Sequence, residues 1–331
     1  MVGPRSAPSS SSPVERGNLQ FRPERPTESS THAHAATITA TVPELPDLAI
    51  VADALHAALA GRAIVRAAAP APLAVRGTPG ELAALVGQEL REVHRRGKFI
   101  LLELERDRIA VNAMLTGRFQ LAATSVKRPP STAVVLAFGA RSGSPRDAAG
   151  WTRGASWLPA DTAEAEIRYR DPSQMGKVYL LPVGVARPVA GLEDDQGPDA
   201  DSPALTLDVW RERIRRHPGE LKSLLRNQAF VAGIGNAYSD EILHAAKLSP
   251  MRRRSSLAPE EVDALYAAMR ATLGNAIGIL RERVPPTFER QVRDFLAVHL
   301  RGGEPCPRCG TRLTEISSRS EATTWCRGCQ R

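Results

Sequence analysis

The stretch QAFVAGIGNAYSDEIL, residues 228–243 of the 331-residue chain, places two glycines directly before a helix-forming run. Gly233 and Gly235 lie one residue apart, and glycine lets backbone amides approach an anion closely. Asn236 then begins a predicted helix, whose free N–H groups and dipole favour phosphate. The alternative is a turn in which glycine only relieves crowding. In both interpretations the stretch connects two helices.

Helical patterns surround this turn, and we predict that residues 206–297 form one helical domain. Basic helices are expected over Asp208–Arg216 and Gly219–Arg226. A long amphipathic helix is expected over Ala258–Glu282, with Pro259 in its first turn, where the missing N–H of proline is tolerated.

All four cysteines lie within the last twenty-six residues, as two Cys-x-x-Cys pairs separated by sixteen residues. When a hairpin brings Cys306, Cys309, Cys326 and Cys329 together, they form a tetrahedral S₄ site, which is the geometry of structural zinc. Because so short a module has little core, the metal would provide most of its folding energy. We therefore predict a zinc finger over residues 298–331. Cysteine confined to such a cluster also fits a reducing compartment.

Residues 43–182 are rich in short strand patterns. A helix is expected over Leu48–Leu59, ended by Gly61. Short strands separated by turn residues favour a two-layer β-sandwich with flanking helices, and 139–166 is predicted to be a long hairpin insertion. The predicted strands are 64–69, 89–94, 99–105, 109–114, 118–122 and 133–138.

The turn Arg95-Arg96-Gly97-Lys98, between two of these strands, allows two interpretations. It is either a solvated turn or a phosphate clamp in which Lys98 acts as a point charge on a DNA backbone oxygen.

Two segments lack the pattern of a folded core. Residues 183–205 are acidic and rich in proline and glycine, which predicts an interdomain linker. Residues 1–42 are rich in Ser, Pro, Thr, Arg and Ala, which predicts disorder. Two other interpretations of 1–42 stay open: a transit peptide, or a translation start placed too far upstream. If Val42 is the true initiation site, removal of the initiator methionine leaves Pro43 as the first residue.

The formal net charge is +8 and the isoelectric point is about 9.8. That sign suits a partner that carries phosphate groups, although charge alone does not separate a nucleic-acid binder from an ordinary basic protein. No apolar run approaches the roughly 20 residues of a membrane-spanning helix. We expect a cytoplasmic protein.

Three motifs, in order along the chain, carry a resemblance to a known family. They are Pro43-Glu44-Leu45-Pro46, Arg95-Arg96-Gly97-Lys98-Phe99 ahead of Leu101-Leu102-Glu103-Leu104, and the run from Gln228 to Leu243. Together they resemble the formamidopyrimidine-DNA glycosylase / endonuclease VIII family, from Pro43 to Arg331. The resemblance implies an α+β fold: an N-terminal two-layer β-sandwich domain with flanking helices, a C-terminal helix–two-turn–helix domain, and a terminal zinc-finger β-hairpin that holds one Zn²⁺.

The resemblance also implies a reaction. Pro43 at a free N-terminus is a secondary amine with a pKa of roughly 8. Its attack on C1′ of a deoxyribose displaces the base and forms an iminium, a Schiff base that permits strand scission. Glu44 is the expected catalytic acid, and Lys98 is expected to act in the catalytic site on a phosphate. Asp47 stands where the family usually has Glu and is expected to support them.

Other residues match the DNA-binding positions of the family. Lys222, Gly235 and Asn236 are expected to hold the backbone beside the extruded nucleotide, with Glu241 in a supporting role.

Four positions depart from the family pattern. Leu115 stands in place of a methionine and Met175 in place of a phenylalanine, and both are still expected to wedge into the base stack. Ser173 replaces an arginine that reads the orphaned base, so that bidentate contact is lost. Glu321 replaces a phosphate-binding arginine of the finger, and its carboxylate is expected to repel phosphate.

Three classes of function follow. The leading prediction is a bifunctional DNA glycosylase and AP lyase that excises oxidised bases, of the formamidopyrimidine or 8-oxoguanine kind, in base-excision repair. It would act as a bacterial, nucleoid-associated monomer on damaged double-stranded DNA, without a nucleotide cofactor. The second class is a catalytically weakened or inactive relative that binds damaged or bent DNA. The third is a zinc-ribbon factor that binds proteins.

Overall fold

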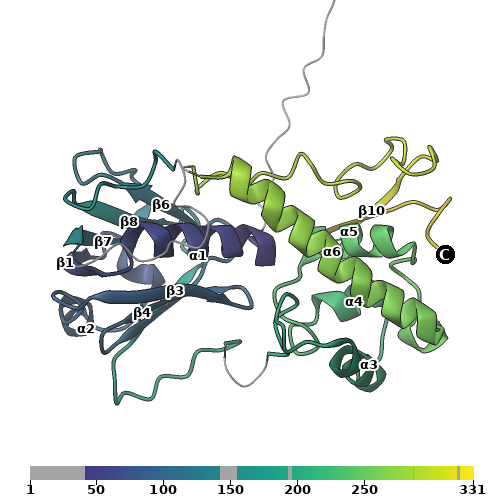
Figure 1. Cartoon of the computed structure of the whole chain (residues 1–331), viewed down its shortest axis with the longest axis horizontal. Helices are drawn as coiled ribbons and strands as arrows, with labels where there is room; N and C mark the ends of the chain where they lie inside the picture. The colour runs from purple at the N-terminus through teal and green to yellow at the C-terminus, as the bar shows by residue number, and fades with distance from the viewer. Residues whose placement is uncertain (1–41, 142–154, 193–195, 286, 319–320) are drawn as a thin grey trace, which may run out of the picture. The chain divides into compact units, whose positions relative to one another are not determined.

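The computed structural model describes residues 42–141, 155–192, 196–285, 287–318 and 321–331 (Figure 1). The disorder predicted for 1–42 falls almost entirely outside the described residues, as does the middle of the predicted hairpin insertion, 142–154. Within the described ranges, no helix has both the length and the apolar character needed to cross a membrane.

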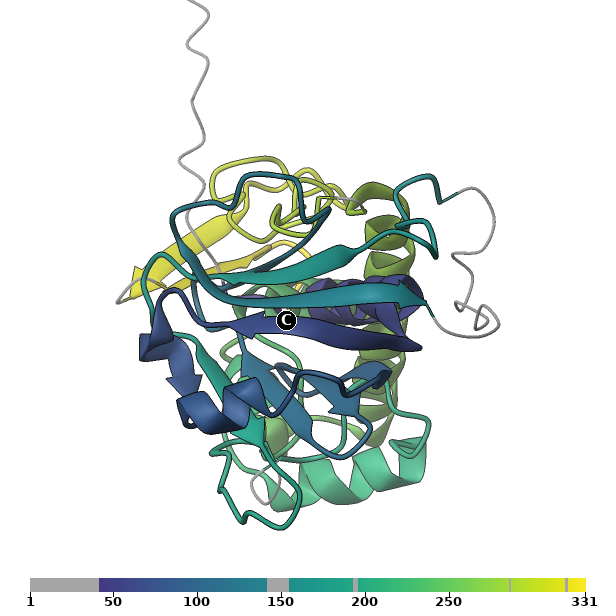
Figure 2. The same ribbon diagram turned by 90° about the vertical axis from the view of Figure 1, so that its left-hand side faces the viewer.

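The first part of the chain forms two β-sheets that face each other (Figures 1 and 2). One sheet has the order β1-β7-β8-β6 and the other the order β2-β9-β5-β4-β3, with every neighbouring pair antiparallel except β2–β9. Apolar side chains of both sheets share one core, so the predicted two-layer sandwich is confirmed. The strands are β1 (Arg62–Ala68), β2 (Val75–Arg76), β3 (Leu90–Arg96), β4 (Phe99–Leu104), β5 (Arg108–Asn112), β6 (Arg118–Ala122), β7 (Thr132–Arg141), β8 (Ala165–Arg170) and β9 (Lys177–Leu181), with the short helices η1 (Pro72–Ala74) and α2 (Pro79–Ala83) between β1 and β3.

The sequence reasoning missed strands β2, β8 and β9, and β8 shows why. Its sequence, AEIRYR, looks half polar, yet Glu166 and Arg168 are fully buried. Arg168 Nε donates to Glu166 Oε2 at 2.8 Å, and Arg66 and Arg128 also contact this carboxylate. Because the charges compensate one another inside the sheet, the strand lacks the apolar alternation on which a prediction depends.

Helix α1 (Leu45–Leu59) begins three residues earlier than predicted. Asp47 explains the earlier start, because its Oδ2 accepts the N–H of Glu44 at 2.8 Å at the helix N-terminus. The helix packs on β3 and on α6, so most of its surface is buried rather than one face.

The second part of the chain is helical, as predicted, and has its own apolar core. Its elements are α3 (Leu207–Arg216), α4 (Leu221–Arg226), α5 (Asn236–Ala246), η2 (Arg254–Ser256) and α6 (Pro259–Arg283). The C-terminal hairpin consists of β10 (Thr314–Ser318) and β11 (Glu321–Trp325).

The predicted linker and the Arg95–Lys98 turn bind each other. Arg95 contacts Asp199 at 2.8 Å and Asp201 at 2.6 Å, while only 7% of its side chain is exposed. Arg96 donates to the carbonyl of Gly197 at 2.9 Å. The two arginines are therefore neither a solvated turn nor a phosphate clamp, and only Lys98 of that motif stays available for a ligand.

The buried cluster in β8 yields a stability prediction. Replacing Glu166 by Gln leaves Arg168 buried without its counter-ion, and we expect a loss of about 2–4 kcal/mol in the free energy of unfolding. The pKa of Glu166 lies at about 2, because its bonds to Arg128, Arg168 and Arg66 outweigh the opposing effect of burial. The difference from wild type should therefore persist at neutral pH and shrink as the pH falls from about 4.5 towards 2.

Urea unfolding at several pH values measures this difference. Glu212→Gln, at an exposed i,i+4 pair with Arg216, is the matched control and should change stability by less than about 0.5 kcal/mol. Equal effects of the two substitutions would contradict a structural role for the β8 cluster.

Candidate functional site

The side chain of Glu44 lies against the N-terminus of α5. Its carboxylate accepts the N–H groups of Gly235 at 2.6 Å, Ala237 at 2.9 Å and Tyr238 at 3.2 Å, and only 3% of the residue is exposed. The helix end predicted to bind a phosphate thus binds an anion, but that anion is Glu44 of the same chain. The N–H of Gly235 is already used in this structure, and its expected phosphate contact stays a prediction.

The two glycines of the turn make room for this contact. Gly233 has φ +98° and its backbone carbonyl accepts the N–H of Leu45 at 2.9 Å. A Cβ at Gly233 would lie 2.8 Å from Leu45, and one at Gly235 would lie 2.5 Å from the Glu44 carboxyl carbon. The glycines are therefore required for the approach of residues 43–45.

The surroundings of Glu44 favour its ionised form. Burial raises its pKa, but Arg293, Lys98 and the N–H groups of α5 together outweigh burial, and the pKa lies below its ordinary value. At neutral pH Glu44 is a carboxylate, which accepts a proton rather than donating one. These surroundings therefore favour acceptance of a proton by Glu44 in the state described, and the catalytic role expected for it stays a prediction.

Arg293 is the residue of this site that sequence reasoning missed. It contacts Asp47 at 2.5 Å and Glu44 at 3.4 Å, and its guanidinium lies 5.3 Å from the centre of the Tyr238 ring. Its side chain is only 14% exposed. A lone arginine after a long helix carries no motif, so only the fold reveals that it reaches residues 43–47.

Lys98 is the second residue of the tight turn between β3 and β4 and is half-buried. Burial lowers its pKa, and Arg226 and Arg293 lower it further against the opposing effect of Glu44. Its side chain has no hydrogen bond or ion pair to any other described residue. Of the predicted site residues, Lys98 is the cation left open for a ligand.

Pro43 itself is buried and lines a small, largely apolar cavity of about 30 Å³. Asp47, Leu48, Phe119 and Phe288 also line it. That volume is about the size of one water molecule, so the cavity does not hold a nucleobase in this conformation.

The two predicted wedge residues are exposed on neighbouring loops. Leu115 is 37% exposed after β5, and Met175 is 48% exposed before β9. Thr116 donates to Asp171 at 2.5 Å, which ties the two loops together, and Ser173 Oγ lies 2.5 Å from Thr116 Oγ1. The hydroxyl that replaces the base-reading arginine therefore serves the loop structure.

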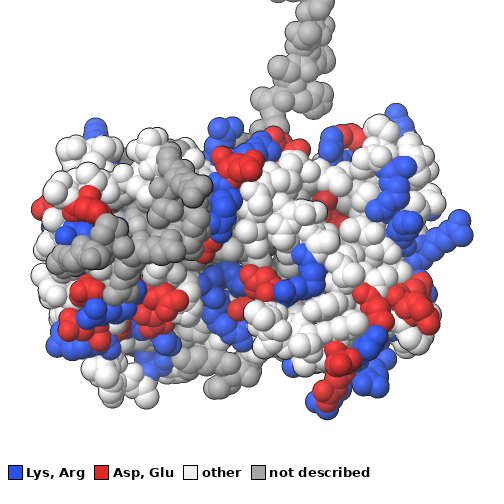
Figure 3. Space-filling view, in the orientation of Figure 1, with Lys and Arg blue, Asp and Glu red and all other residues white. Residues whose placement is uncertain are grey.

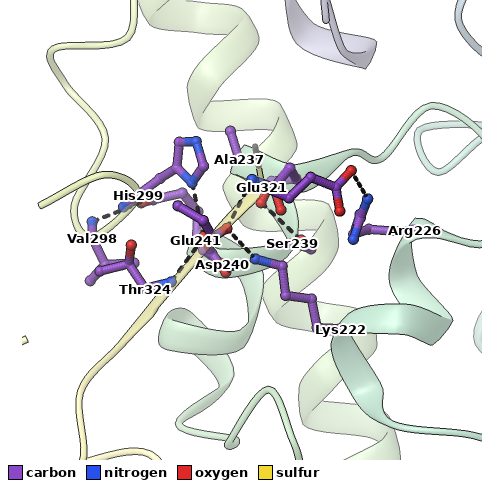
Figure 4. A network of polar contacts seen from close by, with 12 residues as sticks. Lys222, Arg226, Ala237, Ser239, Asp240, Glu241, Val298, His299, Glu321 and Thr324 are labelled. Carbon is purple, nitrogen blue, oxygen red and sulfur yellow. Dashed lines mark hydrogen bonds and ion pairs between the residues drawn. The ribbon is translucent and has the colours of Figure 1, made fainter. Parts of the chain in front are cut away.

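Lys222 and Asn236 bind the finger strand instead of facing solvent. Lys222 donates to Asp240 at 2.6 Å and to the carbonyl of Ala322 at 3.0 Å, and it is 6% exposed (Figure 4). Asn236 Nδ2 donates to the same carbonyl at 2.9 Å. The ammonium of Lys222 is therefore enclosed and charge-compensated in this structure, and its phosphate contact stays a prediction.

Glu241, for which a supporting role was predicted, binds backbone N–H groups through its carboxylate. It accepts the N–H groups of Ala297, Val298 and His299 at 2.7 to 2.8 Å, at the start of the finger (Figure 4).

The four cysteines form a metal site. All four Sγ atoms lie within 4.8 Å of one another, with Cys309 to Cys326 at 3.4 Å and Cys306 to Cys329 at 3.9 Å. Four sulfurs at the corners of a tetrahedron about Zn²⁺ lie roughly 3.8 Å apart. The site fits one structural Zn²⁺, as predicted.

Three family models match the chain. Residues 42–178 match the formamidopyrimidine-DNA glycosylase N-terminal domain, residues 196–284 the formamidopyrimidine-DNA glycosylase H2TH domain, and residues 303–331 a zinc finger found in FPG and IleRS. A formamidopyrimidine-DNA glycosylase of Geobacillus kaustophilus is 32% identical over 301 residues, which cover 88% of this chain and 100% of the relative. Another, of Symbiobacterium thermophilum, is 31% identical and covers 87% of this chain and 89% of the relative. The chain therefore belongs to the formamidopyrimidine-DNA glycosylase family.

Solved structures share the fold. The Lactococcus lactis Fpg in complex with an abasic site containing DNA has a TM-score of 0.72 at 24% identity, covering 87% of this chain and 99% of that one. A complex of the same enzyme with a Fapy-dG containing DNA gives the same TM-score.

The requirement for glycine at position 233 can be tested by measuring the free energy of unfolding of variants. Gly233→Ala forces an L residue to φ +98° against Leu45, and we expect a loss of about 1–3 kcal/mol. Gly274→Ala in α6, where nothing lies within 4 Å of the added Cβ, should instead gain about 0.5–1 kcal/mol. Chemical denaturation of both variants measures the difference, and a tolerated Gly233→Ala would show that residues 43–45 do not need this close approach.

Zinc removal should act locally. Chelation is expected to raise hydrogen–deuterium exchange across 298–331, because the metal organises a module with little core. The sheet residues of the sandwich should keep their protection, and added Zn²⁺ should restore the finger. Native mass spectrometry without a bound zinc ion would contradict the assignment.

Proposed function

We propose that this protein is a DNA glycosylase with AP-lyase activity that removes oxidised bases of the formamidopyrimidine or 8-oxoguanine kind from double-stranded DNA. Membership of the family and the names of the relatives support the glycosylase class. The observation that carries the proposal is the position of the Glu44 carboxylate, in the residue directly after Pro43. This carboxylate binds the N-terminus of α5, and Lys98 and Arg293 lie beside it. It would act as a monomer in the bacterial cytoplasm, without a nucleotide cofactor.

The proposed chemistry needs an amine, a proton acceptor and charges that hold the sugar–phosphate backbone. The Pro43 nitrogen attacks C1′, the N–C1′ bond forms, and the glycosidic bond breaks as the base leaves and takes a proton from solvent. The nitrogen loses its own proton to a carboxylate, for which Glu44 is the adjacent candidate. The C1′–O4′ bond then breaks, O4′ takes the proton from that carboxylic acid, and the N–C1′ bond becomes an iminium. The iminium acidifies the C2′ protons, and loss of one of them with departure of the 3′ phosphate cleaves the strand. Zn²⁺ folds the finger and takes no part in these steps.

The reaction has a covalent requirement. A proline nitrogen inside a chain is a tertiary amide, and its lone pair is delocalised into the carbonyl. We propose that the active form begins at Pro43, as it would after initiation at residue 42 and removal of methionine. The match to the N-terminal family model also begins at residue 42.

On the face shown in Figure 3, surface charge does not by itself mark a DNA-binding site. In Figure 3, basic and acidic side chains alternate over the face shown, and many are paired. A second candidate function, a DNA-binding relative without catalysis, is favoured by Ser173, whose hydroxyl is used between the two wedge loops.

Borohydride trapping on an abasic duplex separates the two functions. A version of the protein that begins at Pro43 should give a covalent adduct, and the 331-residue chain with its first residues intact should give none. In the short version, Glu44→Gln keeps one of the two oxygens that accept N–H groups of α5 and cannot take a proton, so the trapping rate should fall by about 10²–10⁴. Glu260→Gln, on the exposed start of α6, is the matched control and should trap at the wild-type rate.

Two outcomes would count against the proposal. A short version that binds the duplex but forms no adduct would support the non-catalytic candidate. An adduct from the intact 331-residue chain, verified by mass, would place the nucleophile at another residue.

A further inference from the structure

Helix α4 has two basic residues on one face, and they differ in how accessible their side chains are to a ligand. Lys222 and Arg226 are four residues apart, so their side chains lie one above the other towards the finger (Figure 4). Lys222 is enclosed, with its ammonium shared between Asp240 and the carbonyl of Ala322. Arg226 is 32% exposed. Of these two cations, Arg226 is therefore the one that a phosphate in solvent can reach.

Arg226 has most of its donors free. A guanidinium has five N–H donors, and among the described residues the Arg226 side chain makes one contact, from Nη2 to Glu321 Oε1 at 2.5 Å. Glu321 begins β11 and is 53% exposed. A single-oxygen contact of this kind leaves another edge of the guanidinium available for a bidentate ligand.

Arg226 also lies beside the Pro43–Glu44 site. Gln228 Nε2 donates to the carbonyls of both Arg226 and Ile234, and Ile234 directly precedes Gly235, whose N–H binds the Glu44 carboxylate. On the other side, Lys222 and Asn236 both bind the carbonyl of Ala322, the residue after Glu321. These contacts hold β11, and with it Glu321, next to the end of α4.

We propose that Arg226 is the cation of α4 that binds a DNA backbone phosphate, and that Glu321 is its positioning residue. The inference rests on the proposed function, since it assumes that DNA reaches Lys98 and Glu44. Arginine suits the role because its planar fork matches two phosphate oxygens, while Glu321 holds the opposite side of the guanidinium. The carboxylate expected from the sequence to repel DNA is instead compensated by Arg226.

The test is the salt dependence of binding. With the version that begins at Pro43, fluorescence anisotropy on an abasic-analogue duplex and on an undamaged duplex is measured from 50 to 300 mM KCl. Arg226→Ala should lower the magnitude of the slope of log K against log[salt] by about 0.9, the value for one phosphate contact. Affinity at 0.1 M salt should fall on the order of tenfold on both duplexes.

A matched control is available on α3. Arg216 also forms an exposed pair with a glutamate, Glu212, so Arg216→Ala removes the same charge from the same kind of pair. It should leave the slope unchanged. Thermal unfolding of each variant checks that neither substitution disturbs the fold.

Glu321→Gln separates positioning from simple repulsion. If Glu321 positions Arg226, the substitution should raise affinity more in the Arg226→Ala background, where only a negative charge is lost, than in the wild-type background. Equal gains in affinity in both backgrounds would show that Glu321 does not position Arg226.

Two results would overturn the inference about Arg226 itself. If wild type binds and traps DNA but Arg226→Ala keeps the full slope, Arg226 does not bind phosphate. If wild type neither binds nor traps, the proposed function fails, and this inference fails with it.

Discussion

The contact between the Glu44 carboxylate and the N-terminus of α5 joins the two halves of the chain. A buried carboxylate is costly unless hydrogen bonds and positive charge compensate it. Here three backbone N–H groups, the helix dipole and Arg293 do so. Because Glu44 directly follows Pro43, this contact places the start of α1 at the Gly233–Gly235 turn. The same interaction therefore sets the position of the proposed nucleophile and the ionisation state of its neighbour.

Much of the positive charge of the chain is used inside the protein. Arg95 holds the segment between the two halves through Asp199 and Asp201, and Arg168 lies buried with Glu166 inside a sheet. Lys222 is likewise neutralised by Asp240. A net charge of +8 consequently says little about where DNA would bind. The cations that can bind DNA are those with free hydrogen-bond donors. Among the described residues near Glu44, Lys98 and Arg226 have such donors.

Local patterns in the sequence predicted most of the fold, and long-range pairs explain the failures. The helices, the turn and the Cys-x-x-Cys pairs are short-range features whose spacing is visible in one stretch of chain. Strand β8 was missed because Glu166 is compensated by Arg66 and Arg128, which lie elsewhere in the sequence, as well as by Arg168 of the same strand. Arg293 was missed for the same reason, since its partners, Glu44 and Asp47, lie about 250 residues earlier. The glycine turn was located correctly, yet its anion could not be identified without the fold.

The finger is a small module, but its position does not depend on zinc alone. The carbonyl of Ala322 accepts from both Lys222 and Asn236, and Glu241 holds the backbone of residues 297–299. Asp240 connects these two sets of contacts, since it binds Lys222 and also lies 2.9 Å from His299 Nδ1 (Figure 4). Residues that look like DNA contacts in the sequence thus serve to fix β11 on the helical domain. Since these residues hold β11, the phosphate contact that we propose falls to a neighbour with free donors, Arg226, at the position one turn along α4.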